Sequence, residues 1–350
     1  MHACPGTHPF FRHRLFLSYS VKILIIRVSS LGDVLHNMPV VSDLLQHFPN
    51  ASIDWVVEEA YVNLVRLHPG VRRIIPFALR RWRKKLLSSQ NRAEMRQFLR
   101  ALREEQYDLI LDTQGLLKTG LLMGWAQTSQ NGKKAGLANG TVGSGYEGIS
   151  RIFHDQSVAV DPYTHAVLRG RLVAAAAAGY TVDRPAVFGI QPPICDAAWM
   201  PAHPFVVFFH GTAGAAKKWG RSNWIAVADY LQTLALPVLL PWGNAEEKAE
   251  AEAMAAAMPN ASVLPALSMQ EATLLAYSAT LAIGVDTGLT HIAAAYETPT
   301  IELYCASPKW KTEGNWSERI INLGDNGEPP TVDVVIQAVQ QFRPNISALG

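Results

Sequence analysis

The chain has 350 residues, of which 49% are hydrophobic and 17% are charged, so its composition excludes global disorder and its length favours two domains. A formal net charge of +2 gives no indication of a nucleic-acid partner, and no apolar run reaches the roughly 18–20 uncharged residues that span a bilayer. Three scattered cysteines show neither metal nor disulfide spacing, which favours a reducing compartment.

The N-terminal half alternates strand-like and helix-like segments. Residues 1–20 carry arginines within their apolar run and no small-residue cleavage site, so we expect a disordered extension and not a signal peptide. Strands are expected at 22–28, 52–59, 71–78 and 107–115, and helices at 34–48, 91–106 and 165–179. Residues 131–150, rich in Gly, Asn and Ser, predict a loop. The alternation predicts a parallel sheet with helices on both faces.

A proline-rich stretch over 186–204 predicts a linker, after which the alternation restarts. Strands are expected at 205–211, 236–243, 262–266, 281–286 and 300–305, and helices at 221–235, 245–258, 269–279, 288–297 and 331–342. The predicted organisation is therefore a first domain over 21–185, a second over 205–330, and a C-terminal helix and tail over 331–350. Both domains are predicted to be α/β, Rossmann-like and doubly wound, and to face each other across a cleft where ligands bind.

The segment GVDTGLTHIAAA, 284–295, is the sharpest motif of the second half. A buried strand ends at Asp286, and Thr287 and Gly288 open a helix whose first N–H groups lack internal partners. Such a helix start, at the positive end of the helix dipole, can hold a diphosphate, and His291 could donate to a phosphate or a sugar. An ordinary capped turn explains the same residues equally well.

Two more loops follow strands of the second half. In HGTAGAAKKW, 210–219, Thr212 offers a hydroxyl and Lys217 a mobile positive charge, although the P-loop pattern is absent and a flexible surface loop is an equal reading. In PWGNAEEKAE, 241–250, Glu247 or its neighbour Glu246 could accept hydrogen bonds from ribose hydroxyls. A pair of acids at a helix start is the simpler explanation there.

In the first half, Asp33 follows the first strand in RVSSLGDVLHNMP and suits a helix N-cap. The same position lies at the mouth of the predicted cleft, where a carboxylate could take a proton, with His36 as a rival base. The cationic segment ALRRWRKKL contains Arg81, Arg83 and Lys84, which either are solvated or face an anionic acceptor or phospholipid surface. The segment LDTQGLLKTG places further polar side chains near the cleft, namely Asp112, Gln114 and Lys118.

Together, SSLGDVLHNMP, LDTQGLLKTG, PWG and VDTGLTHIAAA resemble the lipopolysaccharide heptosyltransferases of glycosyltransferase family 9, and SSLGD with VDTGLTH is similar to their type I branch. The likeness runs from about 21 to 342. It implies the two-domain GT-B fold and transfer of L-glycero-D-manno-heptose from ADP-heptose to Kdo of Kdo-lipid A. It also implies inversion at the anomeric centre, no metal or other cofactor, no nucleic-acid partner, and a peripheral place on the cytoplasmic face of the inner membrane.

The resemblance implies a role for each matching residue. Asp33 corresponds to the catalytic base. The donor-binding residues would be Thr212, Lys217, Glu247, Asp286, Thr287, Gly288 and His291. The acceptor-binding residues would be Arg81, Arg83 and Lys84.

The sequence departs from the family pattern at two places. The phosphate loop of the family reads H-A-T-S/T-R-D-D-K, whereas residues 210–217 read HGTAGAAK, and Tyr146 stands where the family has an arginine in A-R-E-P-L-A-S. These changes leave open a type II-like or other nucleotide-sugar transferase, or a nucleotide-sugar or lipid A binding protein without turnover. A dinucleotide-dependent oxidoreductase is disfavoured, because RVSSLGD is not G-x-G-x-x-G.

Overall fold

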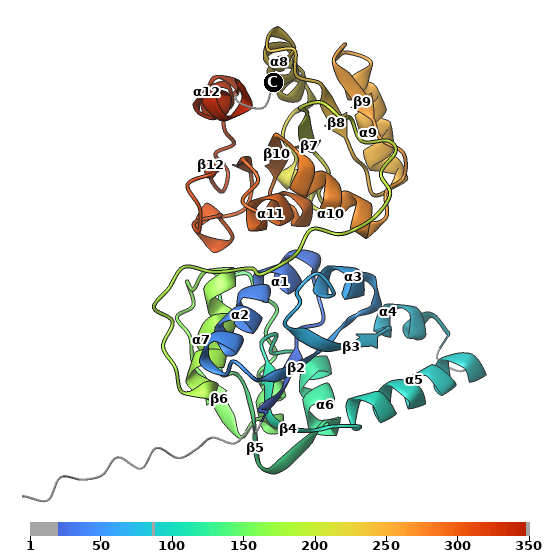
Figure 1. The fold of residues 1–350 in the computed structure, drawn as a ribbon, viewed down its shortest axis with the longest axis vertical. Helices are drawn as coiled ribbons and strands as arrows, with labels where there is room; N and C mark the ends of the chain where they lie inside the picture. The colour runs from blue at the N-terminus through green and yellow to red at the C-terminus, as the bar shows by residue number, and fades with distance from the viewer. Residues whose placement is uncertain (1–19, 86–87, 348–350) are drawn as a thin grey trace, which may run out of the picture.

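The computed structural model describes residues 20–85 and 88–347 and consists of two α/β domains stacked along the long axis (Figure 1). The predicted N-terminal extension, apart from Ser20, lies outside the described residues. The strands of the first domain are β1 (Lys22–Ile26), β2 (Ser52–Glu58), β3 (Val71–Phe77), β4 (Gln106–Asp112), β5 (Gln127–Leu137) and β6 (Gln156–Val158). Its helices are α1 (Leu31–His36), α2 (Met38–His47), α3 (Val62–Val65), α4 (Leu79–Trp82), α5 (Ser89–Leu102), α6 (Leu117–Trp125) and α7 (Ala166–Ala178), with 3-10 turns η1 (Glu59–Tyr61), η2 (Arg83–Lys85) and η3 (Gly148–Phe153).

The second domain begins after the linker and carries the C-terminal helix. Its strands are β7 (Val206–Phe209), β8 (Val238–Leu240), β9 (Ala261–Val263), β10 (Leu281–Val285), β11 (Thr300–Tyr304) and β12 (Ile320–Gly324). Its helices are α8 (Arg221–Thr233), α9 (Ala245–Ala255), α10 (Met269–Ser278), α11 (Gly288–Ala295) and α12 (Val332–Ser347), with 3-10 turns η4 (Ala215–Lys217) and η5 (Lys309–Lys311).

Each domain has one parallel six-stranded sheet. The strand orders are β3-β2-β1-β4-β5-β6 and β12-β11-β10-β7-β8-β9. In each sheet the order in which strands are added reverses beside the first strand, β1 or β7. The central strands are apolar on both faces, because helices cover both sides of the sheet. The predicted pair of doubly wound domains is therefore confirmed, and the carboxyl ends of β1, β7 and β10 are the positions at which open α/β sheets generally bind ligands.

The two domains meet through an apolar contact. Helix α1 packs on α11 and α3 on α10, and one core cluster contains Leu35 and Leu64 of the first domain with Leu275 and Ile292 of the second. The linker runs along this boundary (Figure 1), where the Gln191 N–H donates to Leu67 O at 2.8 Å and the Tyr296 hydroxyl donates to Gln191 O at 2.9 Å. The linker is thus held by both domains.

Some details differ from the sequence expectations. The single helix expected over 34–48 is two helices, broken at Asn37 just before Pro39, which lies in the first turn of α2. The loop expected over 131–150 is wrong for its first part, which belongs to β5, a strand whose solvent-facing half lacks apolar alternation. The short edge strands β6 and β12 and the helix α6 were not expected. None of the described helices is long and apolar enough to cross a bilayer.

Candidate active site

A cavity of about 430 Å³ lies between the domains and gathers side chains from both. Six of the predicted site residues line it: Asp33, Lys217, Asp286, Thr287, Gly288 and His291. Asp33 comes from the first domain and the others from the second. The cavity also includes Gln114 and Lys118, which the sequence placed near the cleft.

Asp33 is held by two arginines and by the start of its own helix. The N-cap of α1 is Ser30 and Asp33 is the third residue of the helix, so the N-cap reading was wrong by three positions. One carboxylate oxygen accepts hydrogen bonds from the Ser30 N–H at 3.1 Å and the Ser30 hydroxyl at 3.0 Å. The other accepts from Arg27 and, at 3.3 Å, from Arg169. Burial raises the pKa of Asp33, but the two guanidinium groups lower it by a larger amount, so the pKa falls well below its usual range.

The two arginines are themselves buried and fixed. Arg27 follows β1 and also donates to Thr113 O, and Arg169 on α7 donates to the Thr141 hydroxyl at 2.8 Å. Burial, with the nearby charge of Arg27, lowers the pKa of Arg169 to about 10, so it is still protonated at neutral pH. Neither arginine was predicted as a site residue, because Arg27 directly follows an apolar strand and Arg169 lies in an alanine-rich helix.

Asp286 is the centre of a second charged network. Its carboxylate accepts from Lys217 Nζ at 2.6 Å, from the Ser307 hydroxyl at 2.6 Å and from His291 Nε2 at 3.0 Å. Burial raises the pKa of Asp286, but the hydrogen bonds and charges of these partners lower it more, so it is ionised. Lys217 is about a third exposed and lines the cavity, which leaves its ammonium group in reach of a ligand.

His291 is buried between two carboxylates. Its Nε2 bonds Asp286 and its Nδ1 bonds Glu302 at 2.8 Å. Burial lowers the pKa of His291, but the charge of Glu302 and the bond to Asp286 raise it to about 10, so the ring is an imidazolium at neutral pH. Within 20–85 and 88–347, no three His, Cys, Asp or Glu side chains form a group that could hold a metal ion.

His36 is a weaker candidate base than Asp33. Its ring is buried 4.9 Å from the ring of His291, centroid to centroid. Burial and the positive charge of His291 lower the pKa of His36 well below its usual value, so the ring is neutral at neutral pH. The pKa of Asp33 is lowered as well, so the two candidates differ in accessibility: the Asp33 side chain is 35% exposed and His36 is 4% exposed. The role of Asp33 as base stays a prediction.

The start of α11 differs in part from its predicted use. Thr287 is the N-cap and lines the cavity, but the Thr290 hydroxyl turns away and donates to Val285 O at 2.8 Å. Gly288 faces Leu31 of the first domain, and a Cβ built on it would stand 2.6 Å from Leu31 Cδ2. A larger residue there would crowd Leu31 at the contact between the domains.

Thr212 and Glu247 lie on the second domain outside the lining of this cavity. Thr212 follows β7 and is half-buried. Glu247 is the third residue of α9 and accepts from the Gly243 N–H at 2.8 Å. Its carboxylate also lies against Gly211, where an added Cβ would be 2.7 Å from the carboxylate carbon. Both residues are thus grouped near the loop 210–217.

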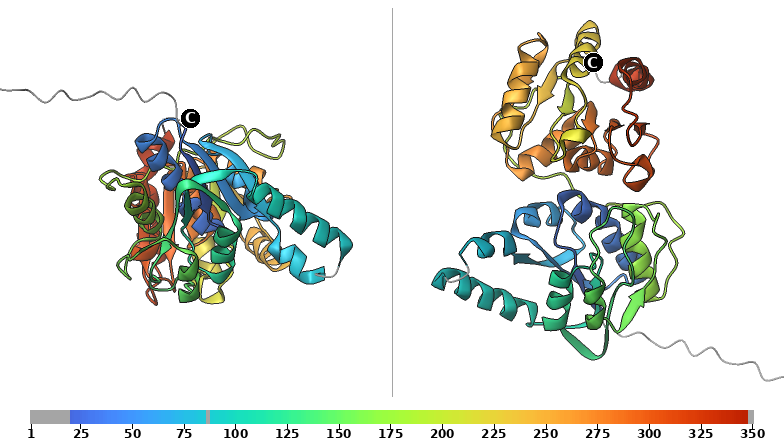
Figure 2. Two further views of the ribbon diagram at one scale, coloured as in Figure 1. Left: turned by 90° about the horizontal axis from the view of Figure 1, so that it is seen from below. Right: turned by 180° about the vertical axis from the view of Figure 1, so that it is seen from behind.

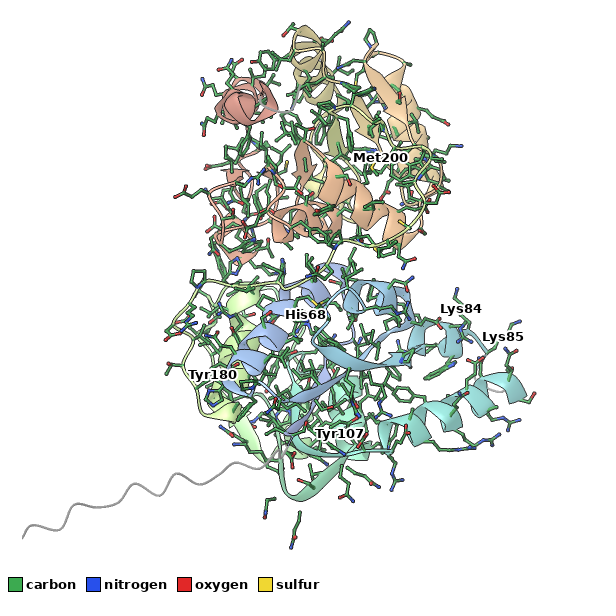
Figure 3. The ribbon with its side chains drawn as sticks, in the orientation of Figure 1. His68, Lys84, Lys85, Tyr107, Tyr180 and Met200 are labelled. Carbon is green, nitrogen blue, oxygen red and sulfur yellow. The ribbon has the colours of Figure 1, made fainter. Side chains whose placement is uncertain are left out.

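The cationic segment forms an arm with α5 that projects from the first domain (Figure 2). Arg81 is engaged in ion pairs with Glu59 at 3.0 Å and Glu94 at 2.7 Å. Arg83 and Lys84 are exposed, and Figure 3 shows Lys84 at the outer end of the arm beside Lys85. The arm therefore offers cations away from the cleft, and these three residues do not line the cavity between the domains.

The segment 111–120 divides into structural and cleft-facing residues. Asp112 is fully buried and accepts from the N–H groups of Gln114 and Gly115 and from the Thr119 hydroxyl, so it fixes the loop. Lys118 faces the cavity and donates to the Ser29 hydroxyl at 3.2 Å. Tyr146, at the position of the family arginine, packs on Gly115 and donates to Ala138 O at 2.7 Å. It does not line the cavity.

Comparisons with known proteins agree with this arrangement. The lipopolysaccharide heptosyltransferase 1 of Pseudomonas aeruginosa is 37% identical over 288 residues, which cover 81% of this chain and 78% of that protein. The same enzyme of Escherichia coli K12 is 32% identical over 81% of this chain and 88% of its own length.

The solved structure of E. coli heptosyltransferase WaaC with ADP superposes with a TM-score of 0.81 at 29% identity, covering 92% of this chain and 100% of that one. The same enzyme with ADP-2-deoxy-2-fluoro heptose gives a TM-score of 0.76. The model of glycosyltransferase family 9 (heptosyltransferase) matches residues 95–341. The chain therefore belongs to glycosyltransferase family 9, the heptosyltransferases.

Proposed function

We propose that the protein transfers L-glycero-D-manno-heptose from ADP-heptose to a hydroxyl of Kdo in Kdo-lipid A, as a type I lipopolysaccharide heptosyltransferase. The observation that carries the proposal is the cavity between the domains, where Asp33 of the first domain faces Lys217 and the start of α11 from the second. In this assignment residues 21–185 hold the acceptor and residues 205–330 hold the donor, with Thr212 and Glu247 serving the phosphates and the ribose.

The reaction is a single displacement. The acceptor oxygen attacks the anomeric carbon of heptose, its proton passes to Asp33, and the bond from that carbon to the ADP oxygen breaks. A carboxylate with a lowered pKa is a weak base, so the hydroxyl must become acidic by bonding to the anomeric carbon before the proton moves. Arg27 and Arg169 hold the carboxylate in place, so its orientation is set before the substrates bind.

The leaving diphosphate develops negative charge, which positive groups of the second domain stabilise. Lys217 is the mobile cation, and the first N–H groups of α11 lie at the positive end of its dipole. These groups support a reaction without a metal ion. Asp286 is saturated by hydrogen bonds and poorly suited to act as a nucleophile, which supports direct displacement with inversion.

The acceptor side is positively charged. Lys118 lies in the cavity, and Arg83 and Lys84 on the projecting arm provide further cations for an anionic lipid headgroup. This supports a peripheral position on the cytoplasmic face of the inner membrane, with the arm towards the lipid.

The test is transfer by the purified protein from ADP-heptose to Kdo-lipid A, followed by mass spectrometry of the product and by NMR of its anomeric configuration. We expect a product one heptose heavier, of inverted configuration, formed equally well with a chelator present. UDP- and GDP-sugars serve as donor controls. ADP-heptose binding without product would refute the proposal in favour of a binding protein, and a product formed only with another donor would replace the assigned substrate.

A further inference from the structure

A second cavity, of about 580 Å³, lies in the first domain between the projecting arm and α6. Most of the side chains that line it are apolar, among them Phe77, Trp82, Phe98, Leu117, Leu121 and Trp125. On one wall, the rings of Phe77, Trp82 and Phe98 pack on one another, with centroids 5.1–5.7 Å apart. The other wall is different, because Leu117, Leu121 and Trp125 remain 40%, 36% and 48% exposed.

These three residues are spaced four apart on α6 and so share one face of the helix. A helix face of this kind in a water-soluble domain is expected to have an apolar partner. The cavity in front of it is large enough for a ligand of some size, since pockets that bury small molecules are of about 300–1,000 Å³.

Charged side chains also line the second cavity. Arg80, Arg83 and Lys118 lie there together with Glu58 and Glu147, so the cations outnumber the carboxylates by one. Glu147 accepts a hydrogen bond from the Leu117 N–H at 2.6 Å. An apolar chamber with an excess of cations in its lining fits an amphiphile whose apolar chain ends in an anionic group.

The second cavity adjoins the first. Ser29, Leu116 and Lys118 line both, and Lys118 Nζ donates to the Ser29 hydroxyl where they meet. A ligand whose sugar lies beside Asp33 can therefore extend past Lys118 into the apolar chamber without leaving the protein surface.

We propose that the second cavity binds one acyl chain of the lipid acceptor, with an adjacent phosphate against Arg80, Arg83 and Lys118. The proposal rests on the proposed function for the identity of the acceptor. In this proposal the arm and α6 bind one acyl chain outside the bilayer and so place the sugar end of the acceptor at Asp33.

The kinetic test compares Kdo-lipid A in detergent micelles with the same acceptor after complete deacylation. Leu121→Gln should raise KM for the acylated acceptor about tenfold, because its amide loses hydrogen bonds to water when a chain covers it, and should leave KM for the deacylated acceptor and both kcat values within twofold. Ile149→Gln is the matched control, since Ile149 is 52% exposed on η3 beside α6 but outside the cavity. A KM that L121Q leaves unchanged, or raises equally for both acceptors, would overturn the proposal.

A binding test is independent of transfer. Trp82 and Trp125 line the cavity, so titration with dodecyl phosphate below its micelle concentration should give a saturable change of tryptophan fluorescence, and inorganic phosphate should not. L121Q should weaken this binding about tenfold and I149Q should not. A wild-type titration without saturation would overturn the acyl site even if heptose transfer occurs. Saturable binding without transfer would support the acyl site and count against the proposed function alone.

A membrane surface is the alternative partner of these residues. Sedimentation with phosphatidylglycerol vesicles that contain no acceptor separates the two readings. If L121Q and I149Q weakened vesicle binding alike, and dodecyl phosphate affinity stayed unchanged in both, the apolar residues would serve membrane docking and the acyl proposal would be refuted.

Discussion

Replacing Asp33 by asparagine removes the proposed base and also leaves two buried cations, Arg27 and Arg169, without their carboxylate. A general base contributes about 10²–10⁴-fold to a rate, so kcat should fall by that factor. Each lost charged hydrogen bond costs about 1.5–3 kcal/mol when buried. Asp33 is 35% exposed, and solvent screening reduces the total. We therefore expect the free energy of unfolding to drop by about 1–2 kcal/mol.

The assay must separate lost chemistry from lost stability. Urea unfolding gives the stability of Asp33→Asn, heptose transfer at a temperature well below its melting point gives kcat, and calorimetry gives its affinity for ADP, which should be unchanged. Asp43→Asn is the matched control: Asp43 pairs with buried Arg171 at 2.7 Å on α2 and α7, outside the cavity. It should lose similar stability and retain kcat. Asp33→Asn that keeps more than a tenth of kcat while folded would refute the role of Asp33 as base.

Three further predictions concern the second domain. Lys217→Met should raise KM for ADP-heptose about 10–100-fold in steady-state kinetics, whereas Lys218→Met, whose partner is a surface glutamate, should not; equal effects would make the loop merely structural. Because the pKa of His291 is raised to about 10, its protonation stabilises the fold fully below about pH 6.5, and this contribution is lost as the pH rises to about 10. The free energy of unfolding, measured with urea, should therefore fall over this pH range, and it should fall less in His291→Gln. Parallel pH profiles of the two proteins would contradict this. Gly288→Ala should lower the unfolding free energy by about 1–3 kcal/mol through its contact with Leu31, and Leu31→Ala should restore part of it; additive losses would place the strain elsewhere.

Most of the fold could be predicted from the sequence because each sheet is buried on both of its faces. Strands such as β1 and β10 are short continuous apolar runs between helices, and such runs can be recognised in a single sequence. The edge strands β3 and β9 were also predicted, whereas β5, β6 and β12 were missed because they lack long apolar runs. β5 begins with polar, partly exposed residues, and β6 and β12 are short edge strands whose side chains are mostly only half-buried.

The candidate site was readable where its residues follow strands. Asp33, Lys217 and Asp286 lie in the segments that follow the carboxyl ends of β1, β7 and β10, and the topology brings these ends to one cleft. Arg169 could not be found this way, because it reaches Asp33 from the first turn of α7, 136 residues away in the sequence. The sequence also could not show how the cations of the arm divide: ion pairs engage Arg81, while Arg80 and Arg83 line the second cavity.

The linker has a consequence for engineering. Over 20–85 and 88–347 the backbone passes from one sheet to the other once, between α7 and β7, so a cut there would leave each fragment with a complete sheet. The apolar helices that the cut would expose pack on each other in the intact protein, α1 on α11 and α3 on α10. Separately expressed halves should then recombine by themselves. Hybrids that join halves from different members of the family would show which half selects the donor and which selects the acceptor.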